Sequence, residues 1–233
     1  GDLHLANMAL LEGEVVPFDA IEFNPDLRFT DVMADVAFTR MDLDFRNNPA
    51  LGTRFLNTYL ERTGDYGGVG VLPFYEAYRA LVRAKVEALQ AHEADDPASH
   101  REAAAHYVSQ AEGYTEGGRP LVAITRGVTG VGKSLVSGGV VTELRGVRIR
   151  SDVERKRLAG LDPEAAAGSE VGAGLYAEGM SDRTYARLLE LARPVLAAGY
   201  PVILDATYLD AERRRDARAL AAELGVPFGV LAL

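Results

Sequence analysis

Residues 127–134 read Gly127-Val128-Thr129-Gly130-Val131-Gly132-Lys133-Ser134, which matches the spacing G-x-x-x-x-G-K-[ST] at every fixed position. Glycines allow a backbone to wrap closely around a polyphosphate and to point its N–H groups inward. A β-prone apolar run precedes this loop and a helix is expected from about Lys133, with the positive end of its dipole at the loop. We therefore predict that the eight residues bind ATP, that Lys133 contacts the β- and γ-phosphates, and that Ser134 ligates Mg²⁺.

The sequence around this loop alternates between strands and helices. Apolar, β-prone runs at 121–125, 147–150, 201–205 and 228–233 are separated by helical segments, with helices expected at about 182–198 and 210–224. Such alternation predicts a parallel sheet with flanking helices. The turn-rich stretch 113–120 marks the expected domain boundary. We therefore predict an α/β phosphate-binding domain over 118–233.

Two carboxylates follow predicted strands of this domain. Asp205 ends the strand Val202-Ile203-Leu204 and is expected either to hold Mg²⁺, directly or through water, or to cap the next turn. Asp152 follows the strand 147–150, at the sheet edge where α/β proteins bind ligands. It is expected to accept a proton from an attacking hydroxyl, although Ser151 or Asp152 could equally cap the following helix.

These residues together resemble the P-loop kinases related to gluconate kinase, zeta toxins and polynucleotide kinase, an AAA-type group. The resemblance rests on 127–134, on Arg150-Ser151-Asp152 with Glu154-Arg155-Lys156, and on 202–207. It implies transfer of the ATP γ-phosphoryl group to a substrate hydroxyl, with Asp152 as the base and Lys133 in a catalytic role. Substrate contacts are expected between 157 and 185, including Tyr176 and Arg183. The basic run 155–157 is expected either to form a solvated helix face or to place one of its residues against phosphate or substrate. Lid arginines are expected beyond Leu233.

The first half of the chain reads differently. Residues 28–112 show helical periodicity, and the preceding residues predict a hairpin with its turn at Glu12-Gly13-Glu14. Asp2 and Asn7 have the D-x-x-x-x-N spacing of a kinase catalytic loop, in which Asp accepts the substrate proton and Asn ligates Mg²⁺. Asp19, one hairpin later, is placed as a second metal ligand.

This arrangement resembles the aminoglycoside phosphotransferase family over roughly 1–90, and Asp31 and Asp35 in the following helix fit the resemblance. It implies that 1–112 is the mostly helical carboxyl-terminal lobe of such a kinase, truncated at its amino terminus. The P-loop kinase domain 118–233 is expected to be truncated at its carboxyl terminus, because both ends of the chain interrupt expected structure. We therefore expect the chain to be a piece of a longer protein.

Composition narrows the function further. The chain has 233 residues, no cysteine and a formal net charge of -9. The lack of cysteine excludes thiolate catalysis and Cys-zinc sites and fits a cytoplasmic location. No apolar run approaches membrane-spanning length, and the acidic balance disfavours nucleic-acid partners. Partner chains and oligomeric state cannot be read from the sequence.

The expected function is therefore an ATP- and Mg²⁺-dependent kinase acting on a hydroxyl of a small molecule. Two alternatives remain: a P-loop ATPase without transfer activity, and a nucleotide-binding regulatory module. No Asn-Lys-x-Asp element for guanine recognition occurs in the sequence, which argues against a GTPase.

Overall fold

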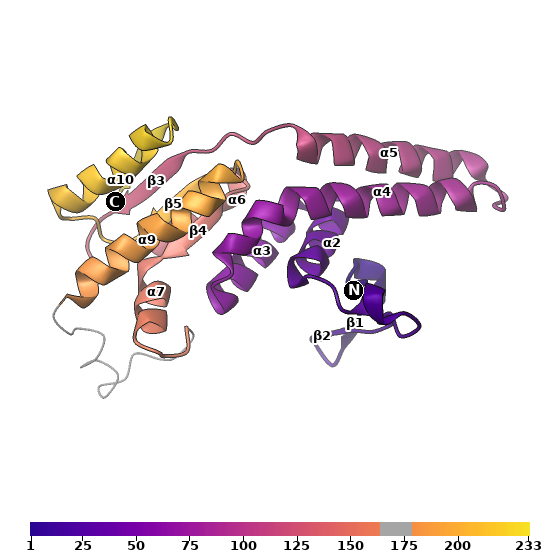
Figure 1. Ribbon diagram of the computed structural model, residues 1–233, viewed down its shortest axis with the longest axis horizontal. Helices are drawn as coiled ribbons and strands as arrows, with labels where there is room; N and C mark the ends of the chain where they lie inside the picture. The colour runs from indigo at the N-terminus through magenta and orange to yellow at the C-terminus, as the bar shows by residue number, and fades with distance from the viewer. Residues whose placement is uncertain (164–178) are drawn as a thin grey trace. The chain divides into compact units, whose positions relative to one another are not determined.

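The computed structural model describes residues 1–163 and 179–233, and it divides into two compact units (Figure 1). The first comprises Gly1–Gly52 and Gly68–Gly117, and the second comprises Thr53–Gly67 and Gly118–Leu233. The junction at 117–118 falls inside the turn-rich stretch that marks the boundary in the sequence. Residues 53–67 nevertheless pack with the second unit, although the sequence pattern placed all of 1–112 in one domain.

The first unit begins with a 3-10 turn, η1 (Leu5–Asn7), and an antiparallel hairpin of β1 (Met8–Leu11) and β2 (Glu14–Pro17). At the hairpin turn, Glu12 and Gly13 both have positive φ, at 52° and 87°. The hairpin expected from the sequence is therefore confirmed. The helices of the first unit are α1 (Pro25–Arg28), α2 (Val32–Phe45), α4 (Leu72–Gln90) and α5 (Pro97–Thr115).

Helices α2, α4 and α5 form the core of the first unit. A buried ion pair, Arg40 to Glu76 at 2.7 Å, links α2 to α4. Helix α5 continues through Gly113 to Thr115, so the turn-rich stretch starts later than the sequence suggests. The buried apolar cluster consists of Phe38, Met41, Ala80, Ala84, Tyr107 and Ala111.

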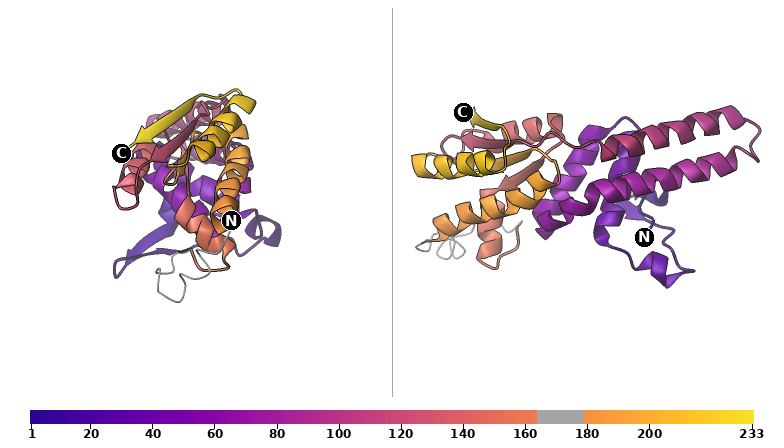
Figure 2. Two further views of the ribbon diagram at one scale, coloured as in Figure 1. Left: turned by 90° about the vertical axis from the view of Figure 1, so that its left-hand side faces the viewer. Right: turned by 45° about the horizontal axis from the view of Figure 1, so that its top comes forward.

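The second unit is built on a parallel sheet of four strands in the order β4-β5-β3-β6. Its strands are β3 (Val122–Arg126), β4 (Val147–Arg150), β5 (Val202–Asp205) and β6 (Phe228–Ala232). Its helices are α6 (Lys133–Glu143), α7 (Ser151–Leu158), α9 (Met180–Ala197) and α10 (Ala211–Glu223), and Figure 2 shows them around the sheet. Every residue of β5 is buried, as expected for a central parallel strand with both faces covered.

The sheet therefore has the parallel topology that the alternating pattern predicts. Because all its strands run in one direction, their carboxyl ends meet at a single edge. The loop 127–134, Asp152 and Asp205 each follow or end one of these strands, which places them along that edge.

A helix from the first half of the sequence protects the outer strand β4. Helix α3 (Pro49–Thr63) is followed by a 3-10 helix, η2 (Tyr66–Val71). The amide of Asn57 on α3 donates to the Gly146 carbonyl (3.0 Å) and accepts from the Arg148 N–H (2.7 Å). One side chain thus bonds the strand edge where a neighbouring strand would otherwise pair.

None of the helices within the described residues combines the length and apolar character needed to span a membrane.

Candidate functional site

The loop 127–134 lines a cavity of about 530 Å³ at the carboxyl edge of the sheet. Gly130 and Gly132 have φ of +86° and +93°. A residue with a side chain would be strained in this left-handed backbone conformation, whereas glycine adopts it readily. A Cβ on Gly127 would lie 2.9 Å from Val131 and 3.0 Å from the Leu233 carbonyl. All three glycines are therefore needed for this loop shape. The remaining lining comes from Thr129, Lys133, Ser134, Leu135, Ser151, Asp152, Arg155, Tyr185, Asp205, Ala206 and Thr207.

Helix α6 starts at Lys133, directly after the left-handed Gly132. The ammonium of Lys133 donates to the backbone oxygen of Val128 at 2.6 Å, within the loop itself. Ser134 is exposed in the first turn of the helix. The start of an α-helix presents free N–H groups and the positive end of the helix dipole. Together with the Lys133 ammonium, they offer an anion three kinds of favourable contact.

Asp205 is buried at the end of β5, with 5% of its surface exposed. Ser137 donates to one of its carboxylate oxygens (2.9 Å), and the Thr125 hydroxyl lies 3.3 Å from the other. Helix α10 is capped by Asp210, which accepts from the Glu212 N–H. Capping of α10 is thus done by another residue, while Asp205 lines the same cavity as Ser134.

Asp152 is the second residue of α7 and lines the loop cavity as well. Its carboxylate is 54% exposed and pairs with the Arg150 guanidinium at 2.9 Å. The residue before α7 is Arg150, and no side chain caps that end of the helix. The alternative in which Ser151 or Asp152 caps α7 is therefore wrong.

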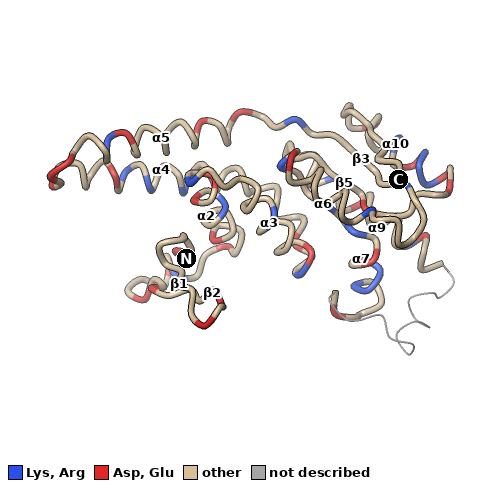
Figure 3. Tube along the Cα trace, turned by 180° about the vertical axis from the view of Figure 1, so that it is seen from behind, with Lys and Arg blue, Asp and Glu red and all other residues tan. Residues whose placement is uncertain are grey.

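Basic residues gather on α7, and the structure separates their roles (Figure 3). Lys156 donates to the Pro163 carbonyl, and Arg157 bonds to Glu154 and to the Glu61 carbonyl. Arg155 lines the cavity, and its buried Nε has no partner among the described residues. Arg155 is therefore the member of the cluster that is placed to meet an anion.

Glu61 on α3, which no sequence pattern singled out, organises two arginines of β4. Its Oε1 accepts from Arg148 (2.8 Å) and its Oε2 accepts from Arg150 (3.3 Å). Arg148 also donates to the Ser134 carbonyl (3.0 Å). Burial lowers the pKa of Arg150, but Asp152 and Glu61 outweigh this effect and raise it overall. Glu61 therefore connects to both Ser134 and Asp152 through one arginine each.

Two further residues of the cavity wall end the stretches 157–185 and 202–207, which the sequence marked without naming a role for either residue. The hydroxyl of Tyr185 on α9 lies 3.0 Å from the Thr207 hydroxyl, and both residues line the cavity. Arg183, which the resemblance suggested as a substrate contact, is exposed on the same helix and does not line this cavity. Tyr176 lies outside the described residues.

In the first unit, the structure brings Asp2 and Asn7 together. The buried amide of Asn7 donates to both the backbone oxygen and a carboxylate oxygen of Asp2, each at 3.1 Å. His4 lies 3.6 Å from the same carboxylate. The Phe18 N–H donates to the Asn7 carbonyl. Asp19, the next residue after Phe18, is exposed and has a φ of 56°.

The segment carrying Asp2 is held on α2. The Leu3 N–H donates to Asp35 (3.4 Å) and the Leu5 N–H donates to Asp42 (2.9 Å). Asp31 caps α2 by accepting from the Met33 N–H. These three carboxylates thus accept hydrogen bonds from backbone N–H groups.

Within residues 1–163 and 179–233, no three Asp, Glu or His side chains form a cluster that could hold a metal ion by themselves. The expected Mg²⁺ ligands are Ser134 with Asp205, and Asn7 with Asp19. Both sets pair one carboxylate with a neutral oxygen. Mg²⁺ commonly completes such sets with water and substrate phosphates, so both remain chemically suitable.

Comparison with known proteins supports a nucleotide-binding fold for the second unit. Residues 122–233 match the family model of the AAA domain, which supports a P-loop nucleotide-binding domain of the kinase-like group. The resemblance of 1–112 to aminoglycoside phosphotransferases stays a prediction.

Relatives cover nearly the whole chain. Uncharacterized proteins of Mycobacterium tuberculosis and Mycobacterium bovis are each 34% identical to it over 222 residues, or 95% of this chain and 44% of the relative. The chain thus spans less than half the length of these curated relatives. No solved structure matches it.

Proposed function

We propose that residues 118–233 act as an ATP-dependent kinase that transfers the γ-phosphoryl group to a hydroxyl of a small molecule. The observation that carries this proposal is that Asp152 lines the same cavity as Lys133, Ser134 and Asp205. A carboxylate at that position suits an acceptor that must lose a proton.

The residues present fit a Mg²⁺-nucleotide. Gly130 and Gly132 hold the loop in a left-handed backbone. Positive charge at the cavity comes from Lys133 and from Arg155, whose buried Nε has no partner in the part of the chain that the structure describes. Ser134 and Asp205 would hold the metal. Bound Mg²⁺-ATP supplies the phosphoryl group and neutralises charge that develops on it.

The protein's own groups would then orient the acceptor. Asp152 would accept a hydrogen bond from the acceptor hydroxyl and take its proton. Its pairing with Arg150, which is held in turn by Glu61, fixes the orientation of the carboxylate. Lys133 would exchange the Val128 carbonyl for phosphate oxygens, and the Nε of Arg155 would donate to a phosphate oxygen. Such cytoplasmic chemistry needs no membrane or nucleic-acid partner.

The test uses the full-length protein with Mg²⁺-ATP and a panel of hydroxyl compounds, with ADP and phosphorylated product measured separately. We expect Asp152→Asn to lower transfer by about 10²–10⁴-fold while ATP affinity stays within about twofold. A suitable control is Glu143→Gln, which removes an exposed carboxylate of α6 outside the loop cavity. The proposal fails if ADP forms at the same rate with and without every acceptor.

A second candidate is a nucleotide-binding regulatory module. The ion pair between Asp152 and Arg150 favours it, because the guanidinium occupies the carboxylate that an acceptor hydroxyl would have to contact. Such a module would bind Mg²⁺-ATP in the calorimeter without consuming it.

The contact between Asn7 and Asp2 supports a further proposal for the first unit. There Asp2 would act as the base of an aminoglycoside-phosphotransferase-type site, with Asn7 and Asp19 as its metal ligands.

A further inference from the structure

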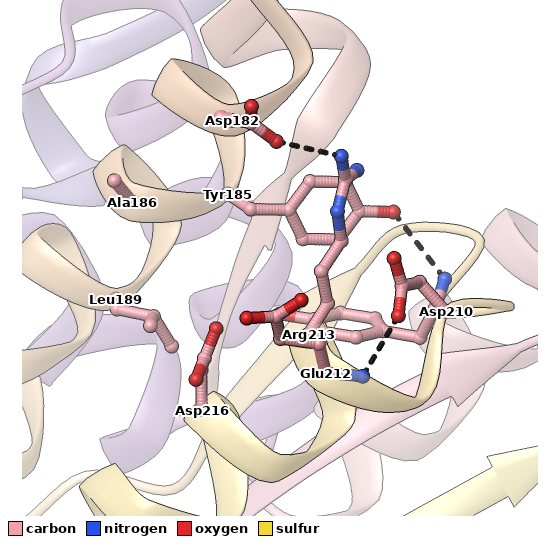
Figure 4. A pocket seen from close by; sticks show the side chains of 9 residues that line it. Asp182, Tyr185, Ala186, Leu189, Asp210, Glu212, Arg213 and Asp216 are labelled. Carbon is pink, nitrogen blue, oxygen red and sulfur yellow. Dashed lines mark hydrogen bonds and ion pairs between the residues drawn. The ribbon is translucent and has the colours of Figure 1, made fainter.

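A second cavity, of about 370 Å³, lies between the amino-terminal ends of α9 and α10 (Figure 4). Four carboxylates line it: Asp182 from α9, and Asp210, Glu212 and Asp216 from the start of α10 and the residue before it. Ala186 and Leu189 add apolar surface. The proposed phosphoryl transfer uses none of these side chains.

The cavity has an excess of negative charge. Among the described residues, Arg213 is the one basic side chain that lines the cavity. Its guanidinium bonds Asp182 (2.9 Å) and stacks 4.0 Å over the ring of Tyr185. Asp210 caps the backbone of α10, while Glu212 and Asp216 have no ion-pair partner among the described residues. The charge of Arg213 is thus already committed to one carboxylate of the four.

An independent observation points to a ligand. Tyr208 lines the cavity with 1% of its surface exposed, and its buried hydroxyl has no hydrogen-bond partner among the described residues. Burial, with Tyr185 and Asp216, raises the pKa of Tyr208, and Arg213 opposes the shift. The hydroxyl is therefore neutral near pH 7 and lies within electrostatic reach of three lining residues. A buried hydroxyl without a partner is costly, and a polar ligand would supply one.

The arrangement suits an organic cation better than a metal ion. No three of the described carboxylates come close enough together to chelate a metal. Carboxylates spread around a cavity of this volume, with an aromatic and aliphatic wall, suit separated ammonium groups on a carbon chain. An ammonium group can also donate to the Tyr208 hydroxyl.

We propose that this cavity binds a small organic cation with two or more protonated amino groups. The site is distinct from the loop cavity but shares Tyr185 as a wall with it. The proposal concerns binding alone and therefore does not require phosphoryl transfer.

The experiment is calorimetry of spermidine with the full-length protein at low ionic strength, because salt screens exposed charges. We expect Glu212→Gln combined with Asp216→Asn to weaken binding about tenfold. The matched control is Glu223→Gln, which removes an exposed carboxylate of the same helix that pairs with Arg193 outside the cavity. That variant should bind spermidine as the unaltered protein does.

Tyr208→Phe provides the second measurement. We expect it to weaken spermidine binding about fivefold, which corresponds to one lost hydrogen bond, with an unchanged or higher melting temperature. The proposal is overturned if spermidine does not bind, if Glu223→Gln weakens binding as much as the double variant, or if Tyr208→Phe binds as tightly as the unaltered protein. It is also overturned if Mg²⁺ at equal concentration displaces spermidine completely.

Discussion

The two units carry similar side chains but satisfy them differently. In the first unit, Asn7 donates to Asp2, while Asp35 and Asp42 accept from backbone N–H groups. In the second, Arg155 faces a cavity with its Nε unpartnered among the described residues. A constellation whose polar groups bond to one another is stable by itself, whereas one with unpaired charge beside a glycine loop is prepared for a ligand. The difference favours the second unit as the nucleotide site.

The largest expected effect tests this assignment directly. Lys133→Ala should lower the rate of phosphoryl transfer by about 10²–10³-fold, because it removes a preorganised cation from the site of developing charge. ATP affinity should fall as well. Both quantities are measured on the full-length protein, by coupled ADP detection and by calorimetry with Mg²⁺-ATP.

Asp19→Ala is the matched variant in the first unit, where Asp19 is exposed and outside the loop cavity. We expect it to leave the nucleotide affinity of the second unit unchanged. Loss of binding in Asp19→Ala with retention in Lys133→Ala would reverse the comparison and place the working site in the first unit.

The next effect tests whether residues 53–67 belong to the second unit. Asn57→Ala leaves the Gly146 carbonyl and the Arg148 N–H without the bonds that Asn57 makes. Each buried group that loses its partner costs about 1–3 kcal/mol, so we expect the free energy of unfolding to fall by about 2–4 kcal/mol. Urea unfolding followed by circular dichroism measures this change.

Thr58→Ala is its control, because Thr58 is the exposed neighbour on α3 and its hydroxyl donates to the Arg54 carbonyl of the same helix. If both variants have the same unfolding free energy, then residues 53–67 are not an integral part of the second unit.

The sequence predicted the second unit more completely than the first. The glycine spacing, the strand–helix alternation and the acids after β4 and β5 depend on local patterns, and the parallel sheet confirms the fold that they predict. The roles of Asn57 and Glu61 could not be predicted, because their partners at Gly146 and Arg148 are distant in sequence. Their i, i+4 spacing places both on one helix face and is the only local signal.

The basic run 155–157 shows the same limit. Adjacent residues of a helix point in different directions, so the sequence indicates that they separate but not which one meets the site. Contacts within the folded unit determine which of the three residues lines the cavity. Lys156 bonds to Pro163 and Arg157 bonds to Glu154, while Arg155 lines the cavity.

A smaller effect is expected at Glu61, which positions residues of the site without lining the loop cavity. Glu61→Gln weakens its bonds to Arg148 and Arg150, so Asp152 should hold its orientation less well. We expect kcat to fall about tenfold, the KM for ATP to change less than threefold, and Glu61→Asp to retain an intermediate kcat. Equal losses of kcat and of thermal stability in both variants would indicate a purely structural role.

The smallest effect compares one tyrosine from each unit. Tyr114 in the first accepts from Gln110 (2.8 Å) and donates to Asp44 (3.0 Å), whereas the buried Tyr66 hydroxyl in the second has no partner among the described residues. At pH 7, Tyr114→Phe should lower the free energy of unfolding by about 1 kcal/mol, while Tyr66→Phe should change it by less than about 0.5 kcal/mol.

Alkaline pH sharpens the contrast between these tyrosines. Burial is the main cause that raises the pKa of both Tyr66 and Tyr114 above the usual value of about 10. The unfolded chain therefore loses these protons first, and the stability that each buried tyrosine contributes declines as pH rises above about 10. Tyr66→Phe removes its share of that decline without a lost hydrogen bond, so this variant should be more stable than the unaltered protein at pH 10.5. Urea unfolding at pH 7 and pH 10.5 measures both terms, and a loss of about 1 kcal/mol for Tyr66→Phe at pH 7 would show that its hydroxyl is bonded after all, which removes this contrast between the units.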